Sequence, residues 1–308
     1  MRKTRGPLAA AVAIAAGLVQ ALSGCAAPAA EAARPDDRPL VLTTFTVLAD
    51  IAREVGGGEV RVESLLKTGA EIHGYEPTPS DLVRASQADL ILDNGLGLEG
   101  WFQQFLRTAD VPHAVLSDGV ATVPIATGHY TGEPNPHAWM SPVAGQAYAD
   151  NAAAALGRLL PDRADVFDAN ARAYREELQS VADRLRVAVS GLPRQSRVLV
   201  TCEGAFSYLA RDAGLDEGFL WAVNSDNEGT PQQIAATTRL VADRNIPAVF
   251  CESTVTDAVQ RQVARATGAT FSGPLYVDSL SGPDGPVPSY LALLEHDVDL
   301  IVRGLSRE

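Results

Sequence analysis

The chain contains few cysteines, few aromatic residues and almost no lysine. Three of its 308 residues are cysteine and 6% are aromatic, while Lys3 and Lys67 are the only lysines among 25 basic residues. Acidic side chains outnumber basic ones by 38 to 25, which gives a formal charge of −13 at pH 7. A general nucleic-acid-binding protein needs a basic face to neutralise phosphates, so this composition argues against that class.

The sequence also contains only one long apolar run, residues 7–21. A helix that spans a bilayer needs roughly 20 apolar residues, so this run is too short. It follows three basic residues and ends at the sequence LSGC (residues 22–25), which resembles the bacterial lipobox. We therefore predict that residues 1–24 form a secretory signal peptide. A plain signal peptide that happens to contain a cysteine is the alternative.

The lipobox resemblance implies that Cys25 is lipidated and becomes the first residue of the mature protein. Residues 25–38, rich in alanine and proline, would then form a flexible, lipid-anchored tether. The protein is expected to be exported and anchored on the outer face of the bacterial cytoplasmic membrane, in the periplasm or at the cell surface. Such a location permits disulfide bonds.

The rest of the chain predicts an α/β fold with two doubly wound lobes, each with a parallel sheet. Its length is about twice that of a usual single domain, and apolar, β-rich runs alternate with amphipathic segments. The predicted strands are residues 39–45, 60–66, 88–93, 113–117, 197–201, 218–223, 247–251 and 270–272. The predicted helices are residues 46–55, 79–86, 98–108, 142–159, 204–213, 231–243, 255–267 and 287–305.

Residues 165–190 differ from the rest, because apolar side chains recur there at three-to-four-residue spacing without interruption. The pattern predicts one rigid helix of about 26 residues, roughly 39 Å long, that joins the lobes as a strut. We place the N-terminal lobe at residues 39–160, the linking helix at 161–192 and the C-terminal lobe at 193–308.

Polar residues of a consistent type lie in the loops that follow the predicted strands, where doubly wound sheets bind their ligands. The candidates are two imidazoles and two carboxylates: His73, His137, Glu203 and Asp278. Together they could close around one divalent cation. Each one alone has an ordinary structural interpretation, since a loop histidine can bond a backbone carbonyl and a carboxylate can cap a helix. No local HExxH signature settles the choice.

Five segments resemble the signature segments of the cluster A-I, or cluster 9, metal-binding lipoproteins of ABC importers, which are solute-binding proteins for manganese and zinc. These segments are IHGYEPTPSDL (72–82), NPHAWMSP (135–142), CEGAFSYLARDAGL (202–215), NEGTPQQI (227–234) and YVDSLS (276–281). The resemblance runs in order from about residue 39 to the C-terminus. It implies two α/β lobes bridged by one long helix, and an ABC permease with its ATPase as partners.

The resemblance places the metal ligands at His73, His137, Glu203 and Asp278, and it implies a monomeric receptor rather than an enzyme. Zinc members usually have histidine at the third position and a His-rich loop, whereas this loop (118–136) contains only His129. Two imidazoles with carboxylate oxygens suit Mn²⁺ or Fe²⁺, while three imidazoles favour Zn²⁺. Manganese is therefore the first choice of transported ion, with zinc and iron as alternatives.

Cys202 departs from the family, many members of which have serine there. If the second lobe has strand order 2-1-3-4, Cys202 and Cys251 lie at the carboxyl ends of neighbouring strands. Neighbouring strands lie about 4.8 Å apart, a Cα separation that a disulfide tolerates. We predict a Cys202–Cys251 disulfide; two buried free thiols and a direct thiolate ligand at Cys202 are the alternatives.

Two other functions remain open from the sequence. A metalloenzyme could use two histidines and a carboxylate to activate water or oxygen, although the sequence offers no obvious general base. A surface adhesin is a role that some lipoproteins of this family were assigned.

Overall fold

The computed structural model describes residues 37–223 and 229–306. The predicted signal peptide, Cys25 and nearly all of the tether lie outside the described residues. From Arg38 onward the chain forms one unit. Among the described residues, no helix is both long enough and apolar enough to cross a membrane.

The N-terminal half contains one four-stranded parallel sheet. Its strands are β1 (Leu40–Thr43), β2 (Arg61–Ser64), β3 (Leu90–Asp93) and β4 (His113–Val115), in the order β2-β1-β3-β4. Its helices are α1 (Thr46–Gly56), α2 (Pro79–Ser86), α3 (Gln103–Thr108) and α4 (Pro142–Leu159). The Thr78 hydroxyl caps α2 and the Ser141 hydroxyl caps α4, each before a proline that needs no N–H partner.

The C-terminal half repeats this arrangement with two strands of six residues and two of only two residues. Its strands are β5 (Val198–Glu203), β6 (Asp216–Trp221), β7 (Ala248–Val249) and β8 (Thr270–Phe271), which pair in parallel as β5-β6 and β7-β8. The N–H of Phe250 donates to the carbonyl of Val200 over 2.8 Å and joins the two pairs. The order is therefore β6-β5-β7-β8, which is the predicted 2-1-3-4 order. The helices are α6 (Ser207–Ala213), α7 (Pro231–Asp243), α8 (Ala258–Thr267) and α9 (Tyr290–Ser306).

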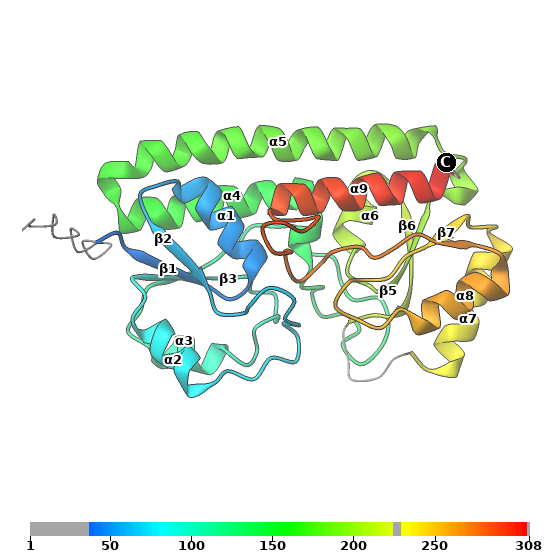
Figure 1. Ribbon diagram of the computed structural model, residues 1–308, viewed down its shortest axis with the longest axis horizontal. Coiled ribbons are helices and arrows are strands. Elements are labelled where there is room, and N and C mark those ends of the chain that lie inside the picture. The colour runs from blue at the N-terminus through cyan, green and yellow to red at the C-terminus, as the bar shows by residue number, and fades with distance from the viewer. Residues whose placement is uncertain (1–36, 224–228, 307–308) are drawn as a thin grey trace, which may run out of the picture. The chain divides into compact units, whose positions relative to one another are not determined.

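One long helix, α5 (Ala164–Gly191, 28 residues), runs along both halves (Figure 1). It packs against α1 and α4 of the N-terminal half, and against α6 and α9 of the C-terminal half. Its buried residues are Phe167, Ala171, Tyr174, Leu178, Val181, Leu185 and Val189, which share one face. The predicted fold class, two α/β lobes with parallel sheets and one long helix, is confirmed. The lobe boundaries at residues 160 and 192 stay predictions.

Several predicted elements differ from those observed at their ends. β8 ends at Phe271 rather than residue 272, and β7 covers two residues rather than five. Pro274 offers no N–H to a neighbouring strand, so regular pairing stops and resumes only as an isolated bridge between Glu252 and Leu275. β5, in contrast, continues two residues further than predicted and includes Glu203 as its last residue.

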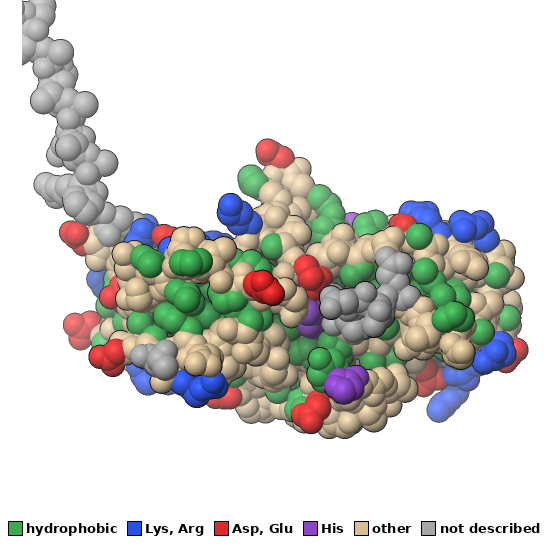
Figure 2. Space-filling view, turned by 90° about the horizontal axis from the view of Figure 1, so that it is seen from below, with side chains coloured by type: hydrophobic (Ala, Val, Ile, Leu, Met, Phe, Trp, Pro, Cys, Tyr) green, Lys and Arg blue, Asp and Glu red, His purple; other side chains and the backbone are tan. Residues whose placement is uncertain are grey.

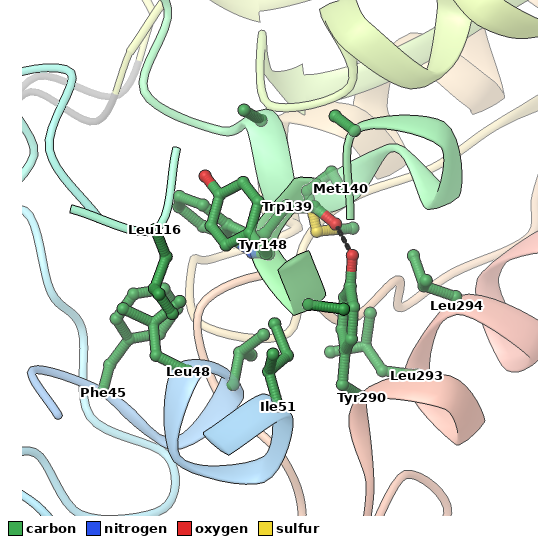
Figure 3. Close-up of a cluster of buried hydrophobic side chains, with 14 of the residues drawn as sticks. Phe45, Leu48, Ile51, Leu116, Trp139, Met140, Tyr148, Tyr290, Leu293 and Leu294 are labelled. Atoms are coloured by element: carbon green, nitrogen blue, oxygen red, sulfur yellow. Dashed lines mark hydrogen bonds between the residues drawn. The ribbon is translucent and has the colours of Figure 1, made fainter. Parts of the chain in front are cut away.

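The main hydrophobic core is continuous through both halves. It includes residues of β1, α1 and α4, but also residues of β5, α6 and α9. Figure 3 shows its centre, where the Tyr290 hydroxyl of α9 donates to the carbonyl of Trp139. The backbone N–H of Tyr290 donates to Asp50 of α1 over 2.7 Å. The two lobes therefore share buried contacts close to the predicted ligand His137.

Glu99 is a buried carboxyl in this core whose ionisation should limit stability. Burial, reinforced by the charge of Asp93, raises the pKa of Glu99 from 4.5 to about 8. The folded state then holds the proton more tightly than the unfolded chain does. The free energy of unfolding should therefore decrease as the pH rises from 4.5 to about 8.

Glu99→Gln cannot ionise, so the variant should lose less stability over this pH range than the wild type. Denaturant unfolding of the two metal-free proteins at several pH values measures the difference. The substitution also alters the group that accepts hydrogen bonds from the Thr44 hydroxyl and the Asn94 N–H. This alteration is the same at every pH, so it shifts the free energy of unfolding of the variant by a constant amount. An identical pH dependence for both proteins would contradict the role of Glu99.

Candidate metal centre

The four predicted ligands lie near the carboxyl ends of strands in both lobes. His73 lies in the loop between β2 and α2, and His137 lies just before the 3₁₀ turn Ala138–Met140 that leads into α4. Glu203 is the last residue of β5, and Asp278 follows β8. Figure 2 shows histidine and acidic side chains near the middle of one face of the molecule.

Three of these side chains converge. The Nε2 atoms of His73 and His137 are 3.0 Å apart, and Glu203 Oε1 lies 3.7 Å from the first and 3.6 Å from the second. The side chains of His137 and Glu203 are 0% and 1% exposed, and that of His73 is 9% exposed. Such a triangle of two imidazole nitrogens and one carboxylate oxygen offers three ligand atoms to one cation.

Asn135 selects the tautomer of neutral His137. Its amide nitrogen donates to the carbonyl of Gly204 over 2.7 Å, so its oxygen is the atom that faces His137 Nδ1 at 2.9 Å. An amide oxygen only accepts, so Nδ1 of His137 carries the hydrogen. The Nε2 atom of neutral His137 is therefore an acceptor, and it lies at hydrogen-bonding distance from Nε2 of His73.

Both imidazoles favour the neutral form that binds metals. Burial lowers the pKa of His137 well below its usual value of 6.5, and the neighbouring His73 lowers it further. Burial also lowers the pKa of His73, against the opposing effect of the Glu71 carboxylate. Because a metal needs the unprotonated nitrogen, a low pKa keeps the site available at neutral pH.

Asp278 stands in a different group. It lies with His73 and Glu71, and one ligand atom from each of the three falls within 4.8 Å of the others. Burial, and then the charge of Glu71, raises the pKa of Asp278 well above its usual value. The structure therefore brings His73, His137 and Glu203 into one set and places Asp278 beside it, with His73 shared.

The backbone around Glu203 is held from the neighbouring strand. The Glu203 N–H donates to both carboxylate oxygens of Glu252, at 3.3 and 3.2 Å. Cys202 and Cys251, the residues that precede these two acids, form the predicted disulfide with a Cα–Cα distance of 4.8 Å. The disulfide prediction is confirmed, and the thiolate-ligand and free-thiol alternatives for Cys202 are wrong in this structure.

Other contacts tie the ligand segments together across the lobes. The Trp139 indole donates to the carbonyl of Val277, next to Asp278. Within the C-terminal lobe, the N–H of Tyr276 donates to Asp297 of α9 over 2.9 Å. Sequence reasoning assigned no role to Glu71, Asn135, Glu252 or Asp297. Asn135 and Glu71 do lie two residues before a predicted ligand, which is a signal that could have found them.

Two lobes, a long helix that packs on both, and buried nitrogen and oxygen atoms that converge from both lobes are an arrangement that suits a metal-binding protein. The family described as ZnuA, zinc-uptake complex component A, periplasmic, matches residues 41–304. The chain belongs to this family of extracytoplasmic, metal-binding components of ABC transporters. The prediction of a transport receptor rather than an enzyme is thereby confirmed.

Individual relatives differ in the metal that their names give. The chain is 47% identical to the iron-binding protein YfeA of Yersinia pestis over 268 residues, which is 87% of this chain and 86% of that protein. It is 31% identical to the manganese-binding lipoprotein MntA of Halalkalibacterium halodurans over 286 residues, covering 92% of this chain and 94% of that one.

Solved structures agree with this fold. The Mn-bound periplasmic metal-binding protein of Candidatus Liberibacter asiaticus has a TM-score of 0.81 and 34% identity, and the match covers 87% of this chain and all of that one. The periplasmic zinc-binding protein TroA of Treponema pallidum has a TM-score of 0.79 and 26% identity, with 87% and 99% covered.

Proposed function

We propose that the protein is a high-affinity receptor that captures Mn²⁺ outside the cytoplasmic membrane and delivers it to an ABC permease and its ATPase. The observation that carries this proposal is the buried convergence of His73, His137 and Glu203, with Asp278 beside them. These four residues are the proposed ligands. The ion is cargo, so the chain binds and releases it without chemical change.

The choice of manganese rests on the ligand set. Two imidazole nitrogens and two carboxylates suit Mn²⁺ or Fe²⁺ better than a three-imidazole site does. The names of MntA and of the Mn-bound structural relative support manganese, and the name of YfeA supports iron as the alternative. Zn²⁺ should still compete in vitro, since Mn²⁺ lies at the weak end of the Irving–Williams series.

Competition binding of Mn²⁺, Fe²⁺ and Zn²⁺ to the mature protein tests the metal. We expect one saturable Mn²⁺ site in the wild type. Glu203→His should raise the preference for Zn²⁺ over Mn²⁺ by about tenfold or more, because it replaces an oxygen ligand with a third imidazole. The exposed Glu76→His, which adds an imidazole away from the triangle, should leave the preference unchanged.

The metal bound in vivo is the stricter measurement. Protein isolated from metal-replete native cells should carry manganese when analysed by mass spectrometry. Isolation with zinc alone would contradict the manganese assignment. We further propose that the protein is a monomer anchored through a lipid on Cys25, as the LSGC sequence indicates.

A further inference from the structure

The structure contains two overlapping groups of metal-ligating side chains that share His73. The inner set is His73, His137 and Glu203, and the outer set is Glu71, His73 and Asp278. In each set, one ligand atom per residue lies within 4.8 Å of the others. Glu71 belongs to neither the predicted ligands nor the family resemblance.

The two sets differ in their access to solvent. The difference comes from Glu71, which is partly exposed; the His73 side chain is 9% exposed, and His137, Glu203 and Asp278 are buried. An ion that arrives from solvent therefore meets Glu71 and His73 before it can reach His137 or Glu203. The shared His73 allows an ion to change sets without giving up every protein ligand at once.

The outer set has oxygen atoms that suit a cation. Asp278 is 1% exposed, and its Oδ1 atom is buried with no hydrogen-bond partner, while Oδ2 accepts from the Thr254 hydroxyl at 3.3 Å. Two carboxylates this close do not both stay charged unless a cation lies between them; without a cation they share a proton. Carboxylate oxygens with one imidazole are ligands that Mn²⁺ accepts.

Glu71 is also held in place. One of its oxygens, Oε1, accepts the backbone N–H of His73 over 3.0 Å, which ties the carboxylate to the backbone of the shared ligand. This contact survives replacement of Glu71 by glutamine, because the amide oxygen can accept the same N–H.

We propose that Glu71, His73 and Asp278 form an outer metal-binding set that captures the divalent cation, which then gains His137 and Glu203 and gives up Glu71 while His73 and Asp278 stay bound. This inference rests on the proposed function, since it assigns a route to the same site. Glu71 is thus an additional ligand during loading.

Association kinetics of Mn²⁺ with the full mature protein provide the first test. Glu71→Gln should lower the association rate constant by about tenfold, because the capture charge is lost. Glu76→Gln removes the same charge from an exposed position in the same loop and should leave the rate unchanged. Circular dichroism checks that both variants are folded.

Equilibrium binding in a His137→Ala background provides the second test. With the inner set broken, the outer set should still hold Mn²⁺ at reduced affinity. Adding Glu71→Gln should weaken this residual binding by a further ~10- to 100-fold, whereas adding Glu76→Gln should not. If Glu71→Gln and Glu76→Gln have equal effects, both in the wild type and in the His137→Ala background, the proposed outer set is wrong. That result would not contradict the proposed receptor function. Absence of saturable binding to the wild type would overturn both proposals.

Discussion

Asp278→Ala should weaken Mn²⁺ binding by more than about 100-fold, because loss of a direct ligand should exceed the ~10- to 100-fold cost of losing an outer-shell partner. The side chain is buried, its Oδ1 atom has no hydrogen-bond partner, and it shares His73 with the inner set. Isothermal titration of the metal-free mature protein measures the affinity.

Asp284→Ala is a matched control for this variant. It removes the same charge from an exposed position six residues further along the chain. Its affinity should equal that of the wild type, which separates the effect of the ligand from that of net charge. Full affinity in both Asp278→Ala and His73→Ala would refute the proposed site.

Removal of the disulfide should have the second-largest effect, which is a decrease in the free energy of unfolding. The Cys202–Cys251 bond joins residues 49 apart in sequence, and the loop-closure model gives about 4 kcal/mol of stabilisation for a loop of that size. The bond also fixes β5 beside β7, where Glu252 accepts the Glu203 N–H. The double variant Cys202→Ala, Cys251→Ala should therefore lose both stability and Mn²⁺ affinity.

Denaturant unfolding and metal titration of this double variant test the two effects separately. Reducing agent should lower the stability of the wild type toward that of the variant and should leave the variant itself unchanged. Both cysteines are fully buried, so reduction of the folded protein should be slow. Equal stability of the wild type and the double variant would contradict the stabilising role of the bond.

The sequence predicted best those features that depend on local patterns of residues. The 3.6-residue periodicity of residues 165–190 predicted α5 to within one residue at each end. The predicted helices 79–86 and 142–159 begin at the same residues as α2 and α4, because a capping hydroxyl followed by a proline marks each start. The predicted strand order brought Cys202 and Cys251 together, because neighbouring parallel strands have a fixed spacing.

The features that were missed depend on contacts between distant segments. The bond from Asn135 to Gly204 joins residues 69 apart, and the one from Glu203 to Glu252 joins residues 49 apart. The hydrophobic periodicity of a helix or strand contains no information about such pairs. The grouping of Asp278 with Glu71 was also missed, because the packing of the two loops, rather than their residue types, decides which carboxylates meet.

The continuous core has a thermodynamic consequence for the whole molecule. Because apolar side chains of both halves pack into the main cluster along α5, neither half buries all of its apolar surface without the other, although the C-terminal half also has a smaller cluster of its own around Val200 and Val249. The two halves should unfold as one cooperative unit rather than as two domains. An ion bound between them then stabilises every part of the protein at once, by an amount set by its concentration relative to its dissociation constant. Release of the ion to the transporter gives up that stabilisation in both lobes together.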